Sequence, residues 1–263
     1  MPLTILVVGA TRGLGLSLAS QYATAGHTVY ATSRTQTVPS SPPNPHPNIH
    51  WIPSIDIASP SAGSALAAKI KLSKTPAPTL DIVIITAGYF ATETFQRLDW
   101  DAEIKMYTTS AIGPVFIVQA LVKAGLIREG KPESKSLGKV ILIGSESGSV
   151  TLRHEKEGGG NYGHHASKAA SNMVGKLLSL DLKEKGIAVA SLHPGFMRTE
   201  MTKGVGFDKY WDEGGAVTPD EAAESTRSFI EGFDMSKTGE YWAPRGARLV
   251  PDPRDPDIIE VHS

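Results

Sequence analysis

The sequence predicts a single α/β domain with a doubly wound Rossmann fold, in which an open parallel sheet of about seven strands carries helices on both faces. Two observations predict it. Short, continuously apolar runs alternate along the chain with segments of helical spacing, and a glycine-rich turn joins the first run to the first helix. Such runs are typical of parallel strands buried on both faces, and their alternation with helices produces a parallel sheet. Because 263 residues suffice for one such domain with a full core, we expect one domain over 1–263.

The first βαβ unit occupies the start of the chain. Residues 3–8 form an apolar run that Gly9 ends, which predicts the first strand. A helix is expected over 14–25, followed by Gly26 at a C-cap position, and a second strand over 28–32. The apolar side chains that share one face of this helix are Leu14, Leu18, Tyr22 and Ala25. Strand, glycine turn, helix and strand together make a βαβ unit.

The same alternation continues along the chain. Pro60 is expected at the first position of its helix, where its missing N–H is harmless. One long helix is expected to be adjusted at Gly113-Pro114, because proline cannot donate a helical hydrogen bond. Thr218 is expected to cap the last helix together with Glu221. The further strands are expected over 49–52, 80–85, 139–143, 187–192 and 240–242, and the further helices over 60–72, 99–124, 162–185 and 218–233.

Three segments lack periodicity: 36–48, 128–137 and 251–257. Their proline-rich or polar composition predicts two loops and a tail. We do not expect a domain linker, since the alternation of strands and helices continues across the first two.

Composition and charge exclude several classes of function. The net charge is −1 and the sequence pI about 6.7, so no global basic field draws the chain to nucleic acid or to a membrane surface. The chain has no cysteine, which excludes disulfides, thiolate metal sites and a cysteine nucleophile. We expect no signal peptide, because no charged and apolar leader pattern is visible before the first strand, and no apolar run approaches the ~20 residues of a membrane span. We therefore expect a cytoplasmic protein whose partner is a small molecule.

A glycine cluster lies between the first strand and the first helix, where a dinucleotide pyrophosphate binds in Rossmann folds. Glycines there let the backbone turn tightly and approach the phosphates, and the helix N-terminus supplies free N–H groups and partial positive charge. The alternative is a glycine turn that serves packing alone, but the position directly after a buried strand favours the cofactor. The residues expected to contact it here are Gly9, Thr11, Arg12, Gly13, Leu14 and Gly15.

The end of the second strand favours NADP(H). An NAD-specific unit carries an acid there to accept from a ribose hydroxyl, whereas this chain has Thr32-Ser33-Arg34. Arg34 can pair with a 2′-phosphate, and Arg12 can add a second cation. The alternative for each arginine is a solvated surface charge.

With these residues in place, the chain resembles the short-chain dehydrogenase/reductase family along nearly its whole length, and within it the C-factor and sniffer-like carbonyl reductases. The glycines match the family's Gly-x-x-x-Gly-x-Gly, and Ser145 matches its active-site serine. The resemblance implies further cofactor contacts at Asp56, Ile57, Ala87, Gly88, Lys168, Pro194, Gly195, Met197 and Thr199. It also implies a homo-oligomer, a dimer or a tetramer, built on the two long helices, although the family's carbonyl reductases include a monomer.

The resemblance also shows where the chain departs from the family. The family's catalytic set is Asn, Ser, Tyr and Lys, of which Ser145 and Lys168 are kept. Ser110 stands at the asparagine position and His164 at the tyrosine position, four residues before the lysine. Tyr162 is no obvious replacement, because two residues turn a helix by about 200° and carry its side chain off the lysine face.

These replacements change the expected chemistry. In the family, the lysine ammonium lowers the pKa of the tyrosine, which protonates the substrate oxygen. The same ammonium lowers the pKa of His164, and a neutral imidazole is a poorer acid. Its terminal nitrogen also lies roughly 2 Å closer to the backbone than a phenol oxygen. Loss of the proton donor removes about 10²–10⁴ of rate.

Three functions follow from this pattern. The first is an NADPH-dependent reductase of a carbonyl or imine, protonated through His164, water or Ser145; an imine protonated in solution needs no phenol. The second is redox-neutral chemistry in the same pocket, namely isomerisation, cyclisation or dehydration. The third is a cofactor-binding pseudoenzyme or an inactive variant. Fold alone does not choose among them.

The sequence raises three further possibilities: a substrate lid, a metal site and a hydrolase triad. A substrate lid is expected around 196–216, where Phe207, Tyr210 and Trp211 either line an apolar pocket or pack the lid. No metal site is expected, because His164 and His165 point about 100° apart on a helix and no third ligand has suitable spacing. A hydrolase triad is disfavoured, since no Gly-x-Ser-x-Gly elbow surrounds Ser145.

Overall fold

The computed structural model describes residues 1–38, 46–131, 138–153, 155, 158–245 and 259–260. Parts of the two predicted loops, 39–45 and 132–137, lie outside the described residues. So does the predicted tail over 251–257.

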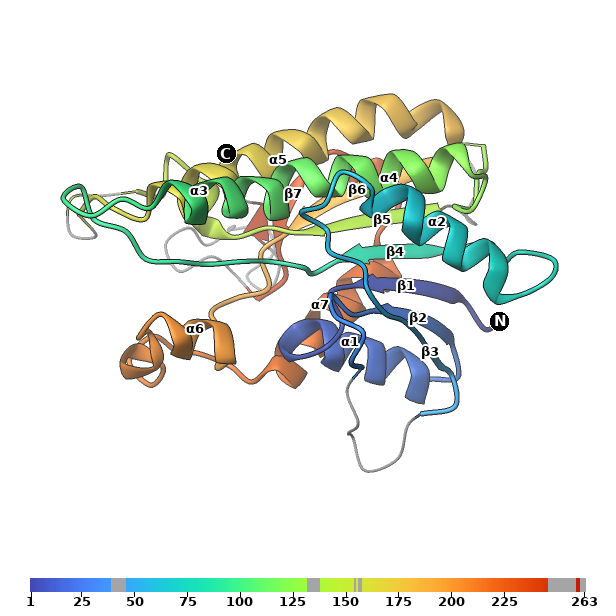
Figure 1. Cartoon of the computed structure of the whole chain (residues 1–263), viewed down its shortest axis with the longest axis horizontal. Helices are drawn as coiled ribbons and strands as arrows, with labels where there is room; N and C mark the ends of the chain where they lie inside the picture. The colour runs from blue at the N-terminus through green and yellow to red at the C-terminus, as the bar shows by residue number, and fades with distance from the viewer. Residues whose placement is uncertain (39–45, 132–137, 154, 156–157, 246–258, 261–263) are drawn as a thin grey trace.

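The strands form one twisted sheet in the order β3-β2-β1-β4-β5-β6-β7-β8 (Figure 1). All neighbours pair in parallel except β7 and β8, which pair antiparallel. The predicted open, doubly wound parallel sheet of about seven strands is confirmed, and β8 is a short addition that the sequence did not predict. The strands are β1 (Thr4–Val8), β2 (Thr28–Thr32), β3 (Ile49–Ile52), β4 (Ile82–Ile85), β5 (Gly138–Ile143), β6 (Ile187–Leu192), β7 (Tyr241–Ala243) and β8 (Ile259–Glu260).

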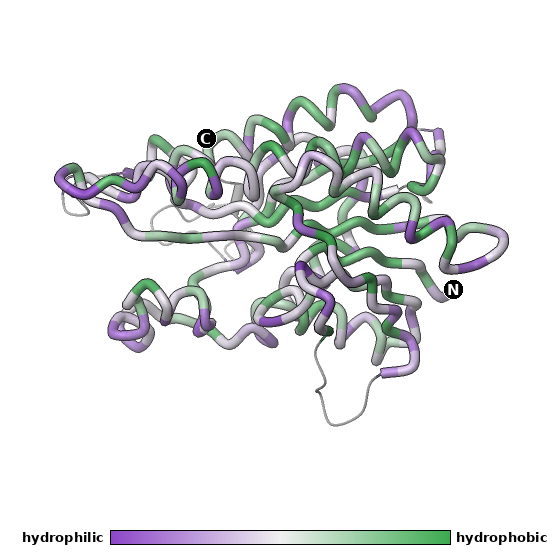
Figure 2. Tube along the Cα trace, in the orientation of Figure 1, coloured by the Kyte–Doolittle hydropathy of each residue, from purple (hydrophilic) through white to green (hydrophobic). Residues whose placement is uncertain are grey.

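Helices cover both faces of the sheet, with α2, α4 and α5 on one face and α1 and α7 on the other (Figure 1). The strands between them are largely apolar, as two-sided burial requires (Figure 2). None of the helices in the described part of the chain combines the length and apolar character that crossing a bilayer requires. The helices are α1 (Gly13–Thr24), α2 (Ala62–Ser73), α3 (Trp100–Tyr107), α4 (Gly113–Lys123), α5 (Tyr162–Leu182), α6 (Glu200–Gly204) and α7 (Pro219–Gly232).

The start of α2 differs from the prediction that placed Pro60 at its first position. The helix begins at Ala62 with Ser61 as N-cap. The preceding residues form a turn of their own, in which the N–H of Ser59 donates to the carbonyl of Asp56 and the N–H of Ala62 to the carbonyl of Ser59. Pro60 therefore belongs to this turn, because its neighbours satisfy their hydrogen bonds locally before the helix begins.

The predicted adjustment of the long helix is confirmed. Residues Thr108–Ile112 form one turn of π-helix, termed η1, between α3 and α4. Pro114 follows in the first turn of α4 and cannot donate a backbone hydrogen bond. Such π-turns are frequent at functional sites, and this one packs against α5.

The capping expected at the last helix is also confirmed. The N–H of Glu221 donates to Oγ1 of Thr218 at 3.3 Å, and the N–H of Thr218 donates to the Glu221 carboxylate at 2.7 Å. The hydrogen bonds from Thr218 lower the pKa of Glu221.

Candidate active site

The predicted glycine loop forms a cradle that no larger side chain fits. Gly9 has φ +91°, and a Cβ on it would lie 2.7 Å from the backbone of Ala87 at the end of β4. A Cβ on Gly15 would lie 2.3 Å from the carbonyl oxygen of Gly9. The N–H of Gly9 donates to Oγ1 of Thr32 at 2.9 Å, which ties the loop to β2. The loop is thus held in the conformation that lets a ligand approach the backbone closely.

Replacing Gly15 by alanine is expected to lower the free energy of unfolding by about 1–3 kcal/mol, the usual effect of overpacking. The new methyl group would meet the Gly9 carbonyl and Oγ1 of Thr86, which lies 2.6 Å from its position. Thermal or urea unfolding measures the loss. Gly232→Ala is the matched control, since nothing lies within 4 Å of a Cβ there; equal stability of the two variants would contradict the close packing.

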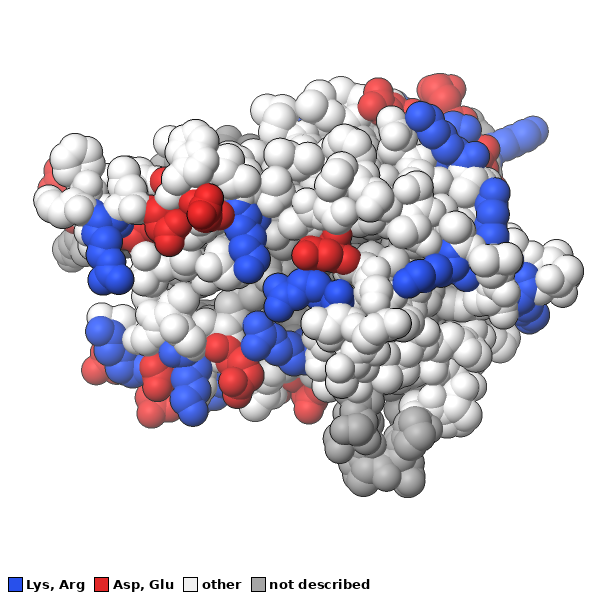
Figure 3. All heavy atoms as spheres, viewed as in Figure 1, with Lys and Arg blue, Asp and Glu red and all other residues white. Residues whose placement is uncertain are grey.

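The first turn of α1 is left free for an anion. Its N-cap, Arg12, is extended and makes no side-chain cap, and the turn contains no acidic residue. Helix N-termini with unsatisfied N–H groups attract phosphate. The exposed side chains of Arg12 and Arg34 lie on the loops that follow β1 and β2. In the space-filling view, several lysine and arginine side chains lie around the hollow near the middle of the visible face (Figure 3).

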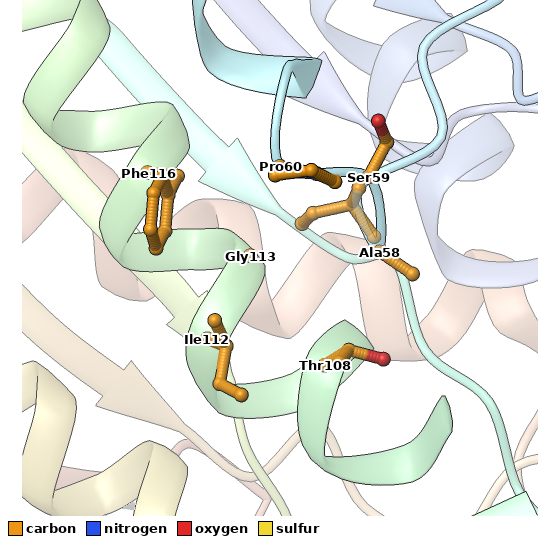
Figure 4. Close-up of a pocket in the computed structure, with 8 residues that line it drawn as sticks. Ala58, Ser59, Pro60, Thr108, Ile112, Gly113 and Phe116 are labelled. Atoms are coloured by element: carbon orange, nitrogen blue, oxygen red, sulfur yellow. The ribbon is translucent and has the colours of Figure 1, made fainter. Parts of the chain in front are cut away.

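The residues predicted to contact the far end of the cofactor follow β3. Asp56 is exposed, and its Oδ1 accepts from the N–H of Ala58 at 3.1 Å. Ile57 is buried and lines a mainly apolar cavity of about 180 Å³ between the loop before α2 and the start of α4 (Figure 4). The other residues that line the cavity are Ala58, Ser59, Pro60, Thr108, Ile112, Gly113 and Phe116.

The segment after β6 folds back towards the glycine loop. Pro194 is buried and Gly195 has φ +92°. Thr199 caps α6, and its methyl group lies 3.6 Å from where a Cβ on Gly13 would be. The methyl of Met201 lies 3.5 Å from the corresponding position on Gly88. The remaining predicted residue of this segment, Met197, forms an isolated bridge with Val217. The predicted contacts after β1, β4 and β6 therefore converge at the carboxyl edge of the sheet.

Ser145 and Lys168 lie next to this edge. Ser145 caps a short 3₁₀ turn, and its Oγ accepts from the N–H of Ser147 at 3.1 Å. The Nζ of Lys168 donates to the carbonyl of Ile143, the last residue of β5, at 3.1 Å. A Cβ on Gly148 would lie 2.6 Å from the backbone of Lys168, so the serine turn and α5 pack closely. Burial lowers the pKa of Lys168 to about 8.

His164 lies one helical turn before Lys168 on α5. Burial lowers its pKa to about 3, and the charges of Lys168, His165 and Arg153 act in the same direction. Its Nδ1 is buried and has no hydrogen-bond partner within the described residues. The imidazole is therefore neutral at physiological pH and is a poor proton donor.

An aromatic contact at His164 was not predicted. Its ring stacks on Phe90 with centroids 4.0 Å apart, and Phe90 meets Phe207 edge-on at 5.5 Å. Phe207 in turn contacts Tyr210 at 6.1 Å. Trp211 instead packs within its own segment, where its Nε1 donates to Oγ1 of Thr202. Phe90 lies two residues after the Ala87-Gly88 motif that follows β4. An aromatic residue this close to the motif is the sequence signal that could have indicated the contact.

Ser110, the predicted residue at the asparagine position, and Tyr162, which the sequence disfavoured as a replacement, differ in burial. Ser110 is buried in η1, and its Oγ has no partner in the described part of the chain. Tyr162 is 41% exposed at the start of α5. The unsatisfied hydroxyl of Ser110 is the one of the two that lies in the interior beside α5.

A second buried imidazole, His193, was also missed. Its Nδ1 accepts from the N–H of Glu146 at 3.3 Å, and its Nε2 lies 3.7 Å from the Glu146 carboxylate. Burial lowers the pKa of His193, although the charge of Glu146 acts against the shift. Glu146 directly follows Ser145 in the chain, so these contacts hold the backbone next to the serine.

Comparison with known proteins identifies the family to which these features belong. The family model for short chain dehydrogenases matches residues 3–209. The chain is 29% identical over 246 residues to 1-hydroxy-2-glutathionyl-2-methyl-3-butene dehydrogenase of Rhodococcus sp. (strain AD45), covering 94% of this chain and 98% of that protein. It is 26% identical over 155 residues to C-signal of Myxococcus xanthus, covering 58% and 80%. Among solved structures, the NADPH-bound carbonyl reductase from chicken fatty liver matches with a TM-score of 0.75 at 24% sequence identity, and the match covers 92% of this chain and 97% of that one. The carbonyl reductase Sniffer of D. melanogaster matches with a TM-score of 0.70 at 21% sequence identity, covering 92% of this chain and 97% of that one.

Proposed function

The chain belongs to the short-chain dehydrogenase family of oxidoreductases, and on that basis we propose that it is an NADPH-dependent reductase of a carbonyl or imine in a small organic substrate. One observation carries the proposal. Lys168, with a pKa lowered to about 8, is kept beside Ser145 at the carboxyl edge of the sheet. A source of protons therefore remains at the site although His164 stands at the family's tyrosine position.

The choice of NADP(H) rests on the cradle and its two arginines. The glycine loop and the uncapped first turn of α1 suit a pyrophosphate, because Gly9 and Gly15 let the loop pack tightly on Ala87 and Thr86, and a helix N-terminus without a cap attracts anions. Arg12 and Arg34 supply the positive charge that suits a 2′-phosphate. The similar carbonyl reductase from chicken fatty liver was solved with NADPH bound. When bound here, NADPH would supply the hydride.

Arg34→Ala is expected to weaken NADPH binding by about 10–100-fold and to leave NADH binding nearly unchanged. A charge-assisted hydrogen bond contributes about 1.5–3 kcal/mol, and every 1.4 kcal/mol is tenfold in affinity. Fluorescence titration of both cofactors measures the ratio. Arg227→Ala on α7 is the control; equal losses for NADPH and NADH in Arg34→Ala would contradict a role in 2′-phosphate recognition.

Four side chains, those of Ser145, Lys168, His164 and Ser110, enter the chemistry that we propose. Because Oγ of Ser145 already accepts from Ser147, its hydroxyl proton is available to donate to the substrate oxygen. Lys168, mostly charged at neutral pH, supplies the proton that a new alcohol oxygen needs. The imidazole of His164 is shorter than a phenol by roughly 2 Å, so a water molecule between Lys168 and the substrate completes the path. Ser110 is assigned by resemblance to the position that supports this path.

An imine substrate suits this site best, because an iminium carbon accepts a hydride without needing an acid. The segment 196–216 is the proposed lid, and Phe207 together with Phe90 forms its apolar contact with the site. We also propose a dimer or tetramer, since apolar side chains are exposed along α5 at Met173, Leu177 and Leu180. A cytoplasmic location stays a prediction.

The proposal is tested by the loss of reduced-nicotinamide absorbance with NADPH and a panel of ketones, quinones and cyclic imines. Consumption of NADPH that depends on the substrate supports the reductase. Substrate conversion without net NADPH consumption would assign redox-neutral chemistry instead. Tight NADPH binding without conversion of any substrate would favour a binding role.

A further inference from the structure

The first turn of α5, which carries His164, is held by residues outside the helix. Its N-cap, Asn161, is left-handed with φ 51° and makes no side-chain cap, and the turn contains no acidic residue. The capping contacts come instead from the segment between β4 and α3, residues 86–99, here called the β4–α3 segment. A helix start needs such partners for its free N–H groups.

Glu93 of this segment supplies them. Its Oε2 accepts from the N–H of Gly163 at 2.9 Å. Its backbone forms a two-way link with Asn161: the N–H of Glu93 donates to Oδ1 of Asn161 at 3.1 Å, and the N–H of Asn161 donates to the carbonyl of Glu93 at 3.0 Å. A carboxylate at a helix N-terminus is also favoured by the helix dipole.

A second carboxyl group, that of Glu103 on α3, also lies beside Gly163. A Cβ on Gly163 would lie 3.1 Å from Cγ of Glu103, 3.2 Å from Oε2 of Glu93 and 2.4 Å from the methyl of Met106. The glycine is therefore the point at which the two acidic side chains meet.

The two carboxyl groups cannot both be ionised without cost. Glu93 is 5% exposed, and its Oε1 is buried without a donor among the described residues. The pKa of Glu103 is raised by burial, by the charge of Glu93 and by a hydrogen bond between the two side chains. A proton on Glu103 satisfies Oε1 of Glu93 and removes the repulsion together.

We propose that Glu93 is the positioning residue for His164, which it holds through Gly163, the residue at which its carboxyl group meets that of Glu103. Phe90, from the same segment, stacks on the imidazole itself. The β4–α3 segment therefore contacts two consecutive residues of α5, Gly163 and His164. The inference rests on the proposed function in so far as His164 lies at the reacting group.

Other titratable groups lie on the elements that pack here. Lys105 of α3 is drawn to the ring of Tyr89, 4.2 Å from its centroid. The Oδ1 of Asp99 accepts from Ala102 at the start of α3. The remaining charged or titratable groups of these elements are Arg97, Asp101, Tyr107, Tyr162, His164, His165, Lys168, Lys176 and Asp181. Among the described residues, Glu93 is the one whose charge acts on Glu103.

The pH dependence has a definite sign. A carboxyl group with a raised pKa stabilises the fold while it is protonated, and this stability is lost as the pH rises through the folded-state pKa. Glu103→Gln keeps a donor towards Glu93 but cannot ionise. We therefore expect wild type and Glu103→Gln to melt together at acidic pH, where Glu103 is protonated, and the variant to melt at a higher temperature once the pH exceeds the folded-state pKa of Glu103.

The experiment combines thermal unfolding across this pH range with NMR of the histidine ring protons. Stacking on Phe90 shifts the His164 signals upfield, and a His164→Asn variant assigns them. Glu93→Gln, which still accepts from Gly163, is expected to keep this shift, whereas Glu93→Ala loses it. Glu224→Gln, an exposed glutamate on α7, is the control and should match wild type at every pH.

Two results would overturn the inference. One is a Glu103→Gln variant whose melting follows wild type at all pH values. The other is an unchanged His164 signal in folded Glu93→Ala; if that variant does not fold, the Glu103→Gln comparison decides alone. None of these readouts requires turnover, so their failure is distinct from a failure of the proposed function.

Discussion

Replacing His164 by tyrosine is expected to raise kcat/KM for ketone reduction with NADPH by about 10²–10⁴. The phenol would stand one helical turn from the Lys168 ammonium, which lowers its pKa and stabilises the phenolate. It would also reach roughly 2 Å further towards the substrate oxygen than the imidazole does. For a cyclic imine that is protonated in solution, the same change is expected to have little effect, because no proton is needed at the reacting nitrogen.

Two controls make this comparison specific. His165→Tyr introduces a phenol at the next residue, about 100° around the helix, and should give no gain. Lys168→Met in the His164→Tyr background should abolish the gain, since the phenol loses its neighbouring charge. A ketone rate in His164→Tyr no higher than in the native chain would contradict the assignment of residue 164 to the proton-donor position.

Lys168→Met is expected to change activity and stability in opposite directions. Loss of the proton source should lower kcat for carbonyl substrates by about 10²–10⁴. The fold, in contrast, should become more stable at neutral pH, because burial of the ammonium group opposes folding and lowers its pKa to about 8. Steady-state kinetics and thermal unfolding of the same preparations measure both effects.

The pH dependence distinguishes the loss of the buried Lys168 ammonium group from a general effect of replacing a lysine. A lysine whose folded-state pKa is lowered destabilises the fold below about pH 8, and this penalty is relieved as the pH rises from there towards the unfolded value of 10.5. The melting temperature of the wild type should therefore approach that of Lys168→Met over this range. Ketone reduction by the wild type should fall as the pH rises through about 8. Lys183→Met, an exposed lysine after α5, should change neither profile.

Much of the scaffold follows from local patterns. The strands over 28–32, 49–52 and 187–192 have the predicted bounds because each is a short apolar run with clear ends. The start of α2 was misplaced, because hydrogen bonds among Asp56, Ser59 and Ala62 compete with the helix-starting preference of proline. Strand β8 was not foreseen, since a two-residue strand depends on its partner β7 and carries no period of its own.

The residues of the candidate site could likewise be predicted from the sequence only in part. The positions of Gly9 and Ser145 after strands and of Lys168 on a helix could be predicted from sequence motifs, and the structure brings them to one edge of the sheet. The contacts of His164 with Phe90 and of Gly163 with Glu93 could not, because they join residues about seventy positions apart through a segment without periodicity. The neutral state of His164 likewise depends on burial that only the folded chain reveals.

The central claim, hydride transfer to a carbonyl or imine, is tested most directly with NADPH deuterated at C4 of the nicotinamide. The native chain would be incubated with this cofactor and the best substrate of the panel, and the product analysed by mass spectrometry. The account predicts one deuterium in the product for each NADPH consumed. A converted product without deuterium, formed while the NADPH concentration stays constant, would contradict it and place the chemistry among redox-neutral reactions.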